Sequence, residues 1–324
     1  MKERIGFTTT IPVEVIIAAG CKPIDLNNIF ITSNNPNHYI SEAERKGFPR
    51  NICAWIKGLY SIAIEKGIKK IICISEGDCA GAVSMCEVAE MDNIEIIPFS
   101  YPMKRDKKKL EQEISFLINR LGTDINKVQK VEKELQPIRN KLKNLDFLTW
   151  KDRKINGEEN HYWLVSGSDF NGNPDEFESN LSKFIEKAES RKSRDLIPLA
   201  YIGVPPIIND LYSYLNELGA DVVFNETQRQ FAMIGEEEDI IDRYLNYTYP
   251  YGIRFRLEND ILPEIKRRGI RGVIHYVQSF CHRQVEDIIL RRIIKMPILT
   301  LECDKPGNLD NRNKIRLEAF MEMF

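Results

Sequence analysis

Short apolar runs alternate with segments of helical period along most of this chain. Residues 273–277, for example, are a β-branched and aromatic run that predicts a buried strand. The next segment spaces Val285, Ile288 and Ile289 at helical intervals, and residues 296–301 form the following strand. A strand–helix–strand order predicts parallel strands. Similar units recur in both halves of the sequence, so we expect an α/β protein in which each half is a small parallel sheet wrapped in helices.

Residues 104–148 differ from the rest because they are highly charged and almost free of glycine and proline. Apolar residues at helical spacing form one stripe over residues 110–118 and another over residues 125–135, with Gly122 between them. This pattern predicts a helical hairpin that joins two α/β domains. The expected parts are an N-terminal domain over residues 1–103, a helical connector over 104–155 and a C-terminal domain over 156–324.

Length and charge restrict the class of protein. The chain has 324 residues, of which 43% are hydrophobic and 29% are charged, so it can build two ordinary cores. A net charge of -2 provides no general electrostatic reason to bind nucleic acid or an anionic membrane. No apolar run approaches the ~18 residues of a membrane span, and the N-terminus has no signal-peptide pattern. We therefore expect a cytoplasmic protein that binds neither nucleic acid nor membranes.

The cysteines are the main candidates for chemistry. Their number is odd and none forms a Cys-x-x-Cys pair, which argues against a zinc ribbon and against a disulfide framework. Three roles for the cysteines remain open: buried thiols, a catalytic thiol, or ligands brought together by the fold. The seven are Cys21, Cys53, Cys73, Cys79, Cys86, Cys281 and Cys303.

Three of these cysteines lie at the ends of predicted elements. Cys79 and Cys281 each follow a predicted strand, at the edge where open α/β sheets bind ligands. Cys53 lies in the first turn of a helix, where the backbone favours a thiolate. Packing in the core would explain each position equally simply. Cys73, inside a strand, and Cys86, on the apolar side of a helix, are interpreted as core residues.

Other polar residues have simpler structural interpretations. Gly203 follows a strand, as in a phosphate loop, but no GxGxxG or GxxxxGK[ST] motif is present, so a tight turn is expected. His275 lies inside a strand and His282 starts a helix, and we assign neither a catalytic role. Five arginines are expected to lie on the solvated surface. They are Arg254, Arg256, Arg267, Arg268 and Arg271.

A set of short segments, spread over nearly the whole chain, occurs in a characteristic order. In that order they resemble the 2-hydroxyacyl-CoA dehydratase family, which includes 2-hydroxyglutaryl-CoA dehydratase D-component-like proteins and benzoyl-CoA reductase subunits. The segments are Ile-Pro-Val-Glu at 11–14, Ala-Ala-Gly-Cys-Lys-Pro at 18–23, the Cys53 segment, Asp78-Cys79, Leu-Gly-Thr-Asp at 121–124, Phe280-Cys281, residues 297–304 and Arg-Leu-Glu-Ala-Phe at 316–320.

The resemblance implies two flavodoxin- or Rossmann-like domains with a [4Fe-4S] cluster in the cleft between them. Carried over residue by residue, the ligands would be Cys53, Cys79 and Cys281, with one iron open to water or substrate. Asp78-Cys79 reverses the Cys-Asp order of many family members, so Cys86 or Cys73 is the alternative second ligand. Residues 224–229 lack a cysteine that members with larger clusters carry, which argues against a double-cubane cluster.

The resemblance also implies a lyase, a 2-hydroxyacyl-CoA dehydratase-like radical enzyme that acts on an acyl-CoA. An ATP-dependent iron–sulfur activator protein would supply one electron, the CoA thioester would be reduced, and water would be lost. The chain would pair with a homologous subunit or with itself, as a hetero- or homodimer. The alternatives are a non-catalytic iron–sulfur electron-transfer or partner subunit, a double-cubane-type reductase of small molecules, and a metal-free periplasmic-binding-like module.

Overall fold

The computed structural model describes residues 2–237 and 239–324 of the chain. It divides into two compact units, each assembled from three segments. Unit 1 contains Met1–Asn140, Ser166–Glu178 and Met233–Tyr251, and unit 2 contains Lys141–Val165, Ser179–Ala232 and Gly252–Phe324. The three-part division expected from the sequence stays a prediction.

Each unit contains a four-stranded parallel sheet, which confirms the predicted α/β class. The strand order is β2-β1-β3-β4 in unit 1 and β6-β5-β7-β8 in unit 2, so the second sheet repeats the topology of the first. The strands are β1 (Arg4–Phe7), β2 (Lys22–Asp25), β3 (Lys70–Glu76), β4 (Glu95–Ser100), β5 (Ile197–Gly203), β6 (Ala220–Asn225), β7 (Gly272–Gln278) and β8 (Ile298–Cys303).

Helices connect consecutive strands in both units, as parallel pairing requires. The helices before residue 150 are α1 (Val13–Ala18), α2 (Leu26–Ile31), α3 (Pro36–Arg45), α4 (Ala54–Glu65), α5 (Ala80–Met91), α6 (Lys107–Arg120) and α7 (Ile125–Trp150). The later ones are α8 (Gly157–Ser166), η1 (Phe170–Gly172), α9 (Pro174–Glu189), α10 (Leu211–Glu217), α11 (Glu226–Phe231), α12 (Ile240–Leu245), α13 (Ile253–Arg256), η2 (Leu257–Ile261), α14 (Leu262–Arg268), η3 (His282–Val285), α15 (Glu286–Ile293) and α16 (Asn311–Met321). The predicted helical pair is present as α6 and α7.

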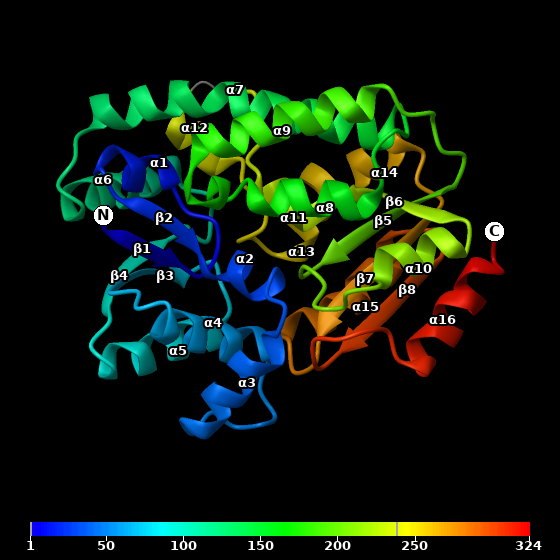
Figure 1. Ribbon diagram of the computed structural model, residues 1–324, viewed down its shortest axis with the longest axis horizontal. Coiled ribbons are helices and arrows are strands. Elements are labelled where there is room, and N and C mark those ends of the chain that lie inside the picture. Colours follow the sequence, from blue (N-terminus) through cyan, green and yellow to red (C-terminus); the bar gives the residue numbers. More distant parts are fainter. Residues whose placement is uncertain (1, 238) are drawn as a thin grey trace. The chain divides into compact units, whose positions relative to one another are not determined.

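Both faces of the sheet in unit 1 are covered. Ile5, Phe7, Ile71 and Ile72 are fully buried on adjacent strands, which is typical of parallel sheets between two helix layers. Figure 1 shows α4 and α5 along one face of this sheet and α1 on the other. The helix α4 is buried over most of its length, so its position is determined by apolar packing on the sheet.

The sheet of unit 2 packs one face against the helices from α13 to α15. Val273 of β7 and Phe224 of β6 meet Leu257, Ile261 and Leu290 in one continuous core. Helices α10 and α16 contact β6 and β8 respectively (Figure 1). The apolar stripe that the sequence predicts on α15 is largely wrong, because Val285 and Ile288 are 66% and 55% exposed and only Ile289 packs, partly buried, against this core. Leu290, outside that stripe, attaches the helix to the sheet.

Residues 233–251 join unit 1 through buried polar contacts. The Tyr244 hydroxyl donates to the Ile11 carbonyl oxygen at 2.9 Å and to Glu14 Oε2 at 2.8 Å. Arg139 of α7 donates to Glu14 Oε1 at 2.5 Å. Burial alone would raise the pKa of Glu14, but the Arg139 charge and these hydrogen bonds hold it below its usual value. The ionised Glu14 thus ties the segment to the start of α1.

A second buried contact ties residues 166–178 to the end of β2. The Asp25 backbone N–H donates to Asp169 Oδ2 at 2.8 Å, and Ser168 donates to Asp25 Oδ2 at 2.6 Å. Asn28 Nδ2 donates to Asp169 Oδ1 at 3.1 Å. Burial, and then the nearby Asp25 charge, raises the pKa of Asp169 to about 7. The pKa of Asp25 is raised as well, mainly by burial.

This carboxyl pair predicts a pH dependence of stability. The folded state holds a proton on Asp169 that the unfolded chain releases near pH 4. This bound proton therefore contributes fully to the stability of the folded state below about pH 4, and the contribution is lost as the pH rises toward about 7. Relative to Asp169→Asn, the wild type should lose on the order of 1–3 kcal/mol between pH 5 and pH 7.5 in urea unfolding. Equal pH slopes for the two proteins would contradict the pKa assignment.

Gly203 ends β5 at a close approach between strands, in agreement with the expected tight turn. Its φ is +108°, and an added Cβ would lie 2.1 Å from the Tyr276 carbonyl oxygen. Gly219 also has positive φ, +83°, but an added Cβ there would have no heavy atom within 4 Å. The two glycines therefore separate the cost of the backbone conformation from the cost of the clash.

We expect Gly203→Ala to lower the free energy of unfolding by more than about 2 kcal/mol, because backbone strain and a steric clash add together. Gly219→Ala, the matched control, should cost only about 1 kcal/mol for its left-handed backbone. Denaturant unfolding of both variants measures the difference. Equal losses would show that the Gly203 contact relaxes without cost.

Candidate functional site

Cys79 lies in the turn between β3 and α5. It is the N-cap of α5, with extended backbone angles, and its side chain makes no capping hydrogen bond to that helix. Its backbone N–H instead donates to Asp78 Oδ1 at 2.7 Å. The thiol therefore stands at the start of a twelve-residue helix, where backbone N–H groups favour negative charge.

Close packing determines the path of this turn. Gly77 has φ +106°, and an added Cβ would lie 2.8 Å from Pro250 Cβ and 2.9 Å from Tyr101 Cβ. Tyr101 is itself held by a 2.8 Å hydrogen bond from its hydroxyl to the Thr10 carbonyl oxygen. A glycine is thus required two residues before Cys79, both for its backbone conformation and for space.

Cys53 occupies the same kind of position on the neighbouring helix. It is the N-cap of α4, and its side chain also makes no capping hydrogen bond. Helices α4 and α5 pack together. An added Cβ on Gly81 would lie 3.6 Å from Cys79 Sγ and 3.3 Å from Ile56 Cγ1 in the first turn of α4. The N-termini of the two helices, each with a cysteine N-cap, therefore lie side by side in unit 1.

Cys281 repeats this arrangement in unit 2. It follows the last residue of β7, Gln278, by three positions, as Cys79 follows Glu76 of β3. It is the N-cap of the 3₁₀ helix η3, without a side-chain capping hydrogen bond, and its N–H donates to the Gln278 carbonyl oxygen at 3.0 Å. The preceding Phe280 has φ +64°, an unusual backbone conformation for a large residue.

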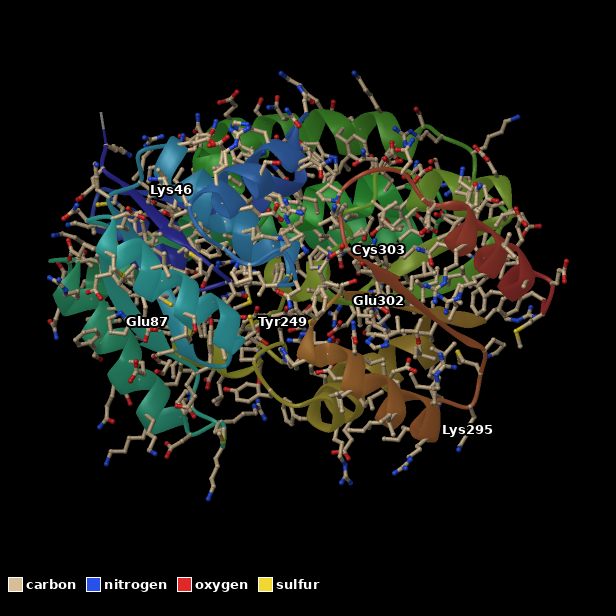
Figure 2. All side chains as sticks on the ribbon, turned by 90° about the horizontal axis from the view of Figure 1, so that it is seen from below. Lys46, Glu87, Tyr249, Lys295, Glu302 and Cys303 are labelled. Atoms are coloured by element: carbon tan, nitrogen blue, oxygen red, sulfur yellow. The ribbon has the colours of Figure 1, made fainter. Side chains whose placement is uncertain are left out.

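The end of β8 supports the Cys281 turn from one side. Ser279 Oγ donates to Glu302 Oε1 at 3.0 Å, and Gln284 Nε2 donates to the same oxygen at 3.2 Å. The Ser279 backbone N–H donates to the Cys303 carbonyl oxygen at 2.9 Å. Figure 2 shows Glu302 and Cys303 together at this end of β8.

The remaining cysteines have different surroundings. Cys73 and Cys86 are 4% and 2% exposed, which confirms that they belong to the core. A hydrogen bond with Cys73, followed by burial, raises the pKa of Cys86. Burial raises the pKa of Cys303 to about 12, and it also raises that of Cys21. Thiols with raised pKa values are poor ligands and poor nucleophiles near neutral pH.

Two histidines belong to the elements on either side of Cys281, His275 to β7 and His282 to η3. His275 is buried in β7, and its Nδ1 lies 3.1 Å from Asp287 Oδ1. Burial would raise the pKa of Asp287, but hydrogen bonds from His275, Thr300 and Arg291 hold it well below its usual value. Desolvation, and then the Arg283 charge, lowers the pKa of His282.

The expectation that the arginines lie on a solvated surface was wrong for two of them. Arg256 is fully buried and Arg268 is 5% exposed. Arg268 forms hydrogen bonds of 2.9 and 2.6 Å with Asp146, and Arg256 is paired with Glu226. Sequence reasoning missed these residues because a buried arginine has no local pattern; its carboxylate partner comes from a distant segment.

No group of three or more His, Cys, Asp or Glu side chains in residues 2–237 and 239–324 is arranged to hold a metal ion. Within the same residues, every helix is too short or too polar to span a membrane. Of the three predicted ligands, unit 1 contains Cys53 and Cys79 and unit 2 contains Cys281.

Comparison with protein families shows to which family the chain belongs. The model of the family described as 2-hydroxyglutaryl-CoA dehydratase, D-component, matches residues 8–324. The chain belongs to this family. The dehydratase D-component match extends through both units and includes Cys53, Cys79 and Cys281, and it confirms the resemblance that the sequence motifs indicated. A comparison with curated proteins found no match. Membership identifies the chain as a dehydratase-type component.

The surroundings of the cysteines predict their reactivity. In the cofactor-free protein at pH 8, iodoacetamide should modify the half-buried Cys53, Cys79 and Cys281 at least about tenfold faster than the core thiols Cys73 and Cys86. Peptide mass spectrometry after timed quenching measures the rates. In guanidinium chloride, where the protein is unfolded, these five cysteines should react at similar rates. Fast modification of Cys86 in the native protein would contradict its assignment to the core.

Proposed function

We propose that the chain is the iron–sulfur subunit of a 2-hydroxyacyl-CoA dehydratase-like radical enzyme, with a [4Fe-4S] cluster held by Cys53, Cys79 and Cys281. The observation that carries the proposal is the common position of these residues, since each is the N-cap of a helix. Membership of the dehydratase D-component family supports the reaction class.

The chemistry of the donor set fits such a cluster. Iron–sulfur clusters are held by cysteine thiolates, and a helix N-terminus stabilises a thiolate through its backbone N–H groups. Cys86 and Cys303 are poorer candidates because their pKa values are raised. The Asp78-Cys79 order does not require Cys86 as a substitute, since Cys79 occupies the same turn position as Cys281.

When bound, the cluster supplies one-electron reduction and, at an iron without a protein ligand, a Lewis acid for a leaving hydroxyl group. The chain's own residues hold the ligands in place. Gly77 permits the close packing of the Cys79 turn, and Glu302 secures the Cys281 turn through Ser279 and Gln284. The exposed Phe280 side chain, 63% accessible, provides an apolar surface next to Cys281.

The substrate in this proposal is an acyl-CoA, whose thioester gains one electron, loses hydroxide and a proton, and then gives the electron back, so that the net reaction is the loss of water. The electron comes from an ATP-dependent iron–sulfur activator protein. The chain acts in a dimer with a homologous dehydratase subunit or with a second copy of itself. Membership of a family of dehydratase components supports a role in such a multi-subunit system.

Iron and acid-labile sulfide counts, together with EPR spectra, test the cluster on anaerobically purified protein. We expect about four irons per chain. Cys53→Ala, Cys79→Ala and Cys281→Ala should each lose the cluster signal, whereas the control variants Cys21→Ala and Cys303→Ala should keep it. About eight irons would favour a double-cubane reductase. No iron after anaerobic reconstitution would contradict the proposal.

Turnover with an activator protein and a panel of 2-hydroxyacyl-CoA esters distinguishes a catalytic dehydratase subunit from a non-catalytic electron-transfer partner. Loss of water catalysed by the chain alone, or by its dimer, would establish the dehydratase. A cluster-containing chain that supports turnover only when a homologous subunit provides the substrate site would instead be the electron-transfer partner.

A further inference from the structure

The helix α15 presents apolar side chains to solvent, although the apolar stripe of a helix that packs on a sheet normally faces the core. Val285, which precedes the helix, and Ile288 are 66% and 55% exposed, and they lie side by side because they are three residues apart. Ile293 is 38% exposed, and Phe280 in the preceding turn is 63% exposed. Exposed apolar side chains gathered on one short segment are typical of a surface that binds another protein.

The exposed charges on the same segment are positive. Arg292, one helical turn from Ile288, and Lys295 are both exposed, and neither forms an ion pair within the part of the chain that the structure describes. Figure 2 labels Lys295 just beyond the end of α15. Glu286 and Asp287 are half-buried, and each is paired with an arginine. The apolar surface is therefore bordered by positive charge that the helix itself does not neutralise.

The helix α5 occupies the corresponding place in unit 1, since it connects β3 to β4 as α15 connects β7 to β8. It also exposes apolar side chains, because Val88 is 37% and Met91 is 84% exposed. Glu87 and Glu90 are exposed beside them, and Figure 2 labels Glu87 on this helix. Neither glutamate forms an ion pair with any described residue. Exposed apolar side chains thus accompany uncompensated negative charge on α5.

The two segments differ in charge over more than a single turn. No lysine or arginine occurs from residue 71 to residue 103, a stretch that contains both α5 and β4. Residues 280–295, by contrast, contain four basic residues, and their exposed charged side chains are all basic. Surfaces of opposite potential attract each other during diffusion and orient the two partners when they meet.

We propose that these two surfaces bind each other between two copies of the chain. We call them the α15 face, made of Phe280, Val285, Ile288, Arg292, Ile293 and Lys295, and the α5 face, made of Glu87, Val88, Glu90 and Met91. An apolar centre with a charged rim is the usual arrangement of a protein interface. Both faces are exposed in one chain, so a second copy provides the complement of each. This inference goes beyond the proposed function, because it requires neither a cluster nor a substrate.

Light scattering and sedimentation of the full chain over a range of protein concentrations test self-association. We expect a mass of two chains, since two different faces that meet reciprocally about a two-fold axis close a dimer. High salt should raise the dissociation constant at least about threefold, because it screens the exposed charges. A mass of one chain at every concentration would overturn the inference.

Charge reversal tests whether the two faces meet. Arg292→Glu with Lys295→Glu, and separately Glu87→Lys with Glu90→Lys, should each raise the dissociation constant at least about tenfold, because like charges then face each other. All four substitutions together restore opposite charges and should bring the dissociation constant back to within about threefold of the wild type. A combined variant that associates as weakly as the separate ones would show that the faces do not meet.

Two matched controls show whether the position of each change matters. Ile288→Asp should weaken association at least about tenfold, since it places a charge in the apolar centre. Ile315→Asp, on the exposed side of α16, should leave association unchanged, and so should Lys183→Glu with Lys187→Glu on α9. Urea unfolding of every variant checks that it is folded. Equal weakening by Ile288→Asp and Ile315→Asp would contradict the assignment of the α15 face.

Cross-linking with a carbodiimide, which joins a carboxylate to an amine in contact with it, identifies the residues that meet. In a mixture of chains with light and heavy isotopes, Lys295 should be joined to Glu87 or Glu90 in peptides that contain both isotopes. Cross-links confined to single chains would overturn the inference.

A homologous subunit is the other candidate for the α15 face. If the wild type binds such a subunit and not itself, and Arg292→Glu with Lys295→Glu abolishes that binding, the inference fails. Iron counts separate this result from the proposed function. Single-chain variants that hold about four irons would show that the cluster does not need the contact. A wild type that associates but holds no iron would retain this inference while the proposed function fails.

Discussion

Parallel strand pairing is the constraint on which the rest of this structure depends. Parallel strands bring their carboxyl ends to one edge of a sheet, so the turns that follow them gather there. In each unit the third strand along the sheet ends in a turn with a cysteine three residues later, Cys79 after β3 and Cys281 after β7. The helix that must connect each strand to the next begins at that cysteine. The same topology thus places a thiol at a helix N-terminus twice.

The two turns reach the same geometry by different means. The Cys79 turn relies on a glycine with φ +106° and on contact with Pro250 and Tyr101. The Cys281 turn has a phenylalanine with φ +64° and is held by Glu302, which accepts hydrogen bonds from Ser279 and Gln284. The two units therefore hold thiols of similar position through different contacts.

Burial separates the cysteines into chemical classes. Cys73 and Cys86 lie in the core of unit 1, and a hydrogen bond with Cys73, followed by burial, raises the pKa of the Cys86 thiol. Cys79 lies only a few residues from both, between β3 and α5, but it is half-buried at the N-terminus of α5, as Cys53 is at the N-terminus of α4. A shift of a few residues along one element thus decides whether a cysteine serves as a small hydrophobic residue or as a candidate ligand.

The sequence by itself determined the α/β class, the α6–α7 pair, the family and the placement of Cys53, Cys79 and Cys281 at element ends, because periodicity and turn signals are local. Only the tertiary structure decided the strand order, the approach of Pro250 to Gly77 and the ion pair between Glu226 and Arg256. These contacts join residues far apart in the chain. A buried arginine in particular has the local pattern of a surface one, and only its folded neighbours, which neutralise its charge, make burial possible.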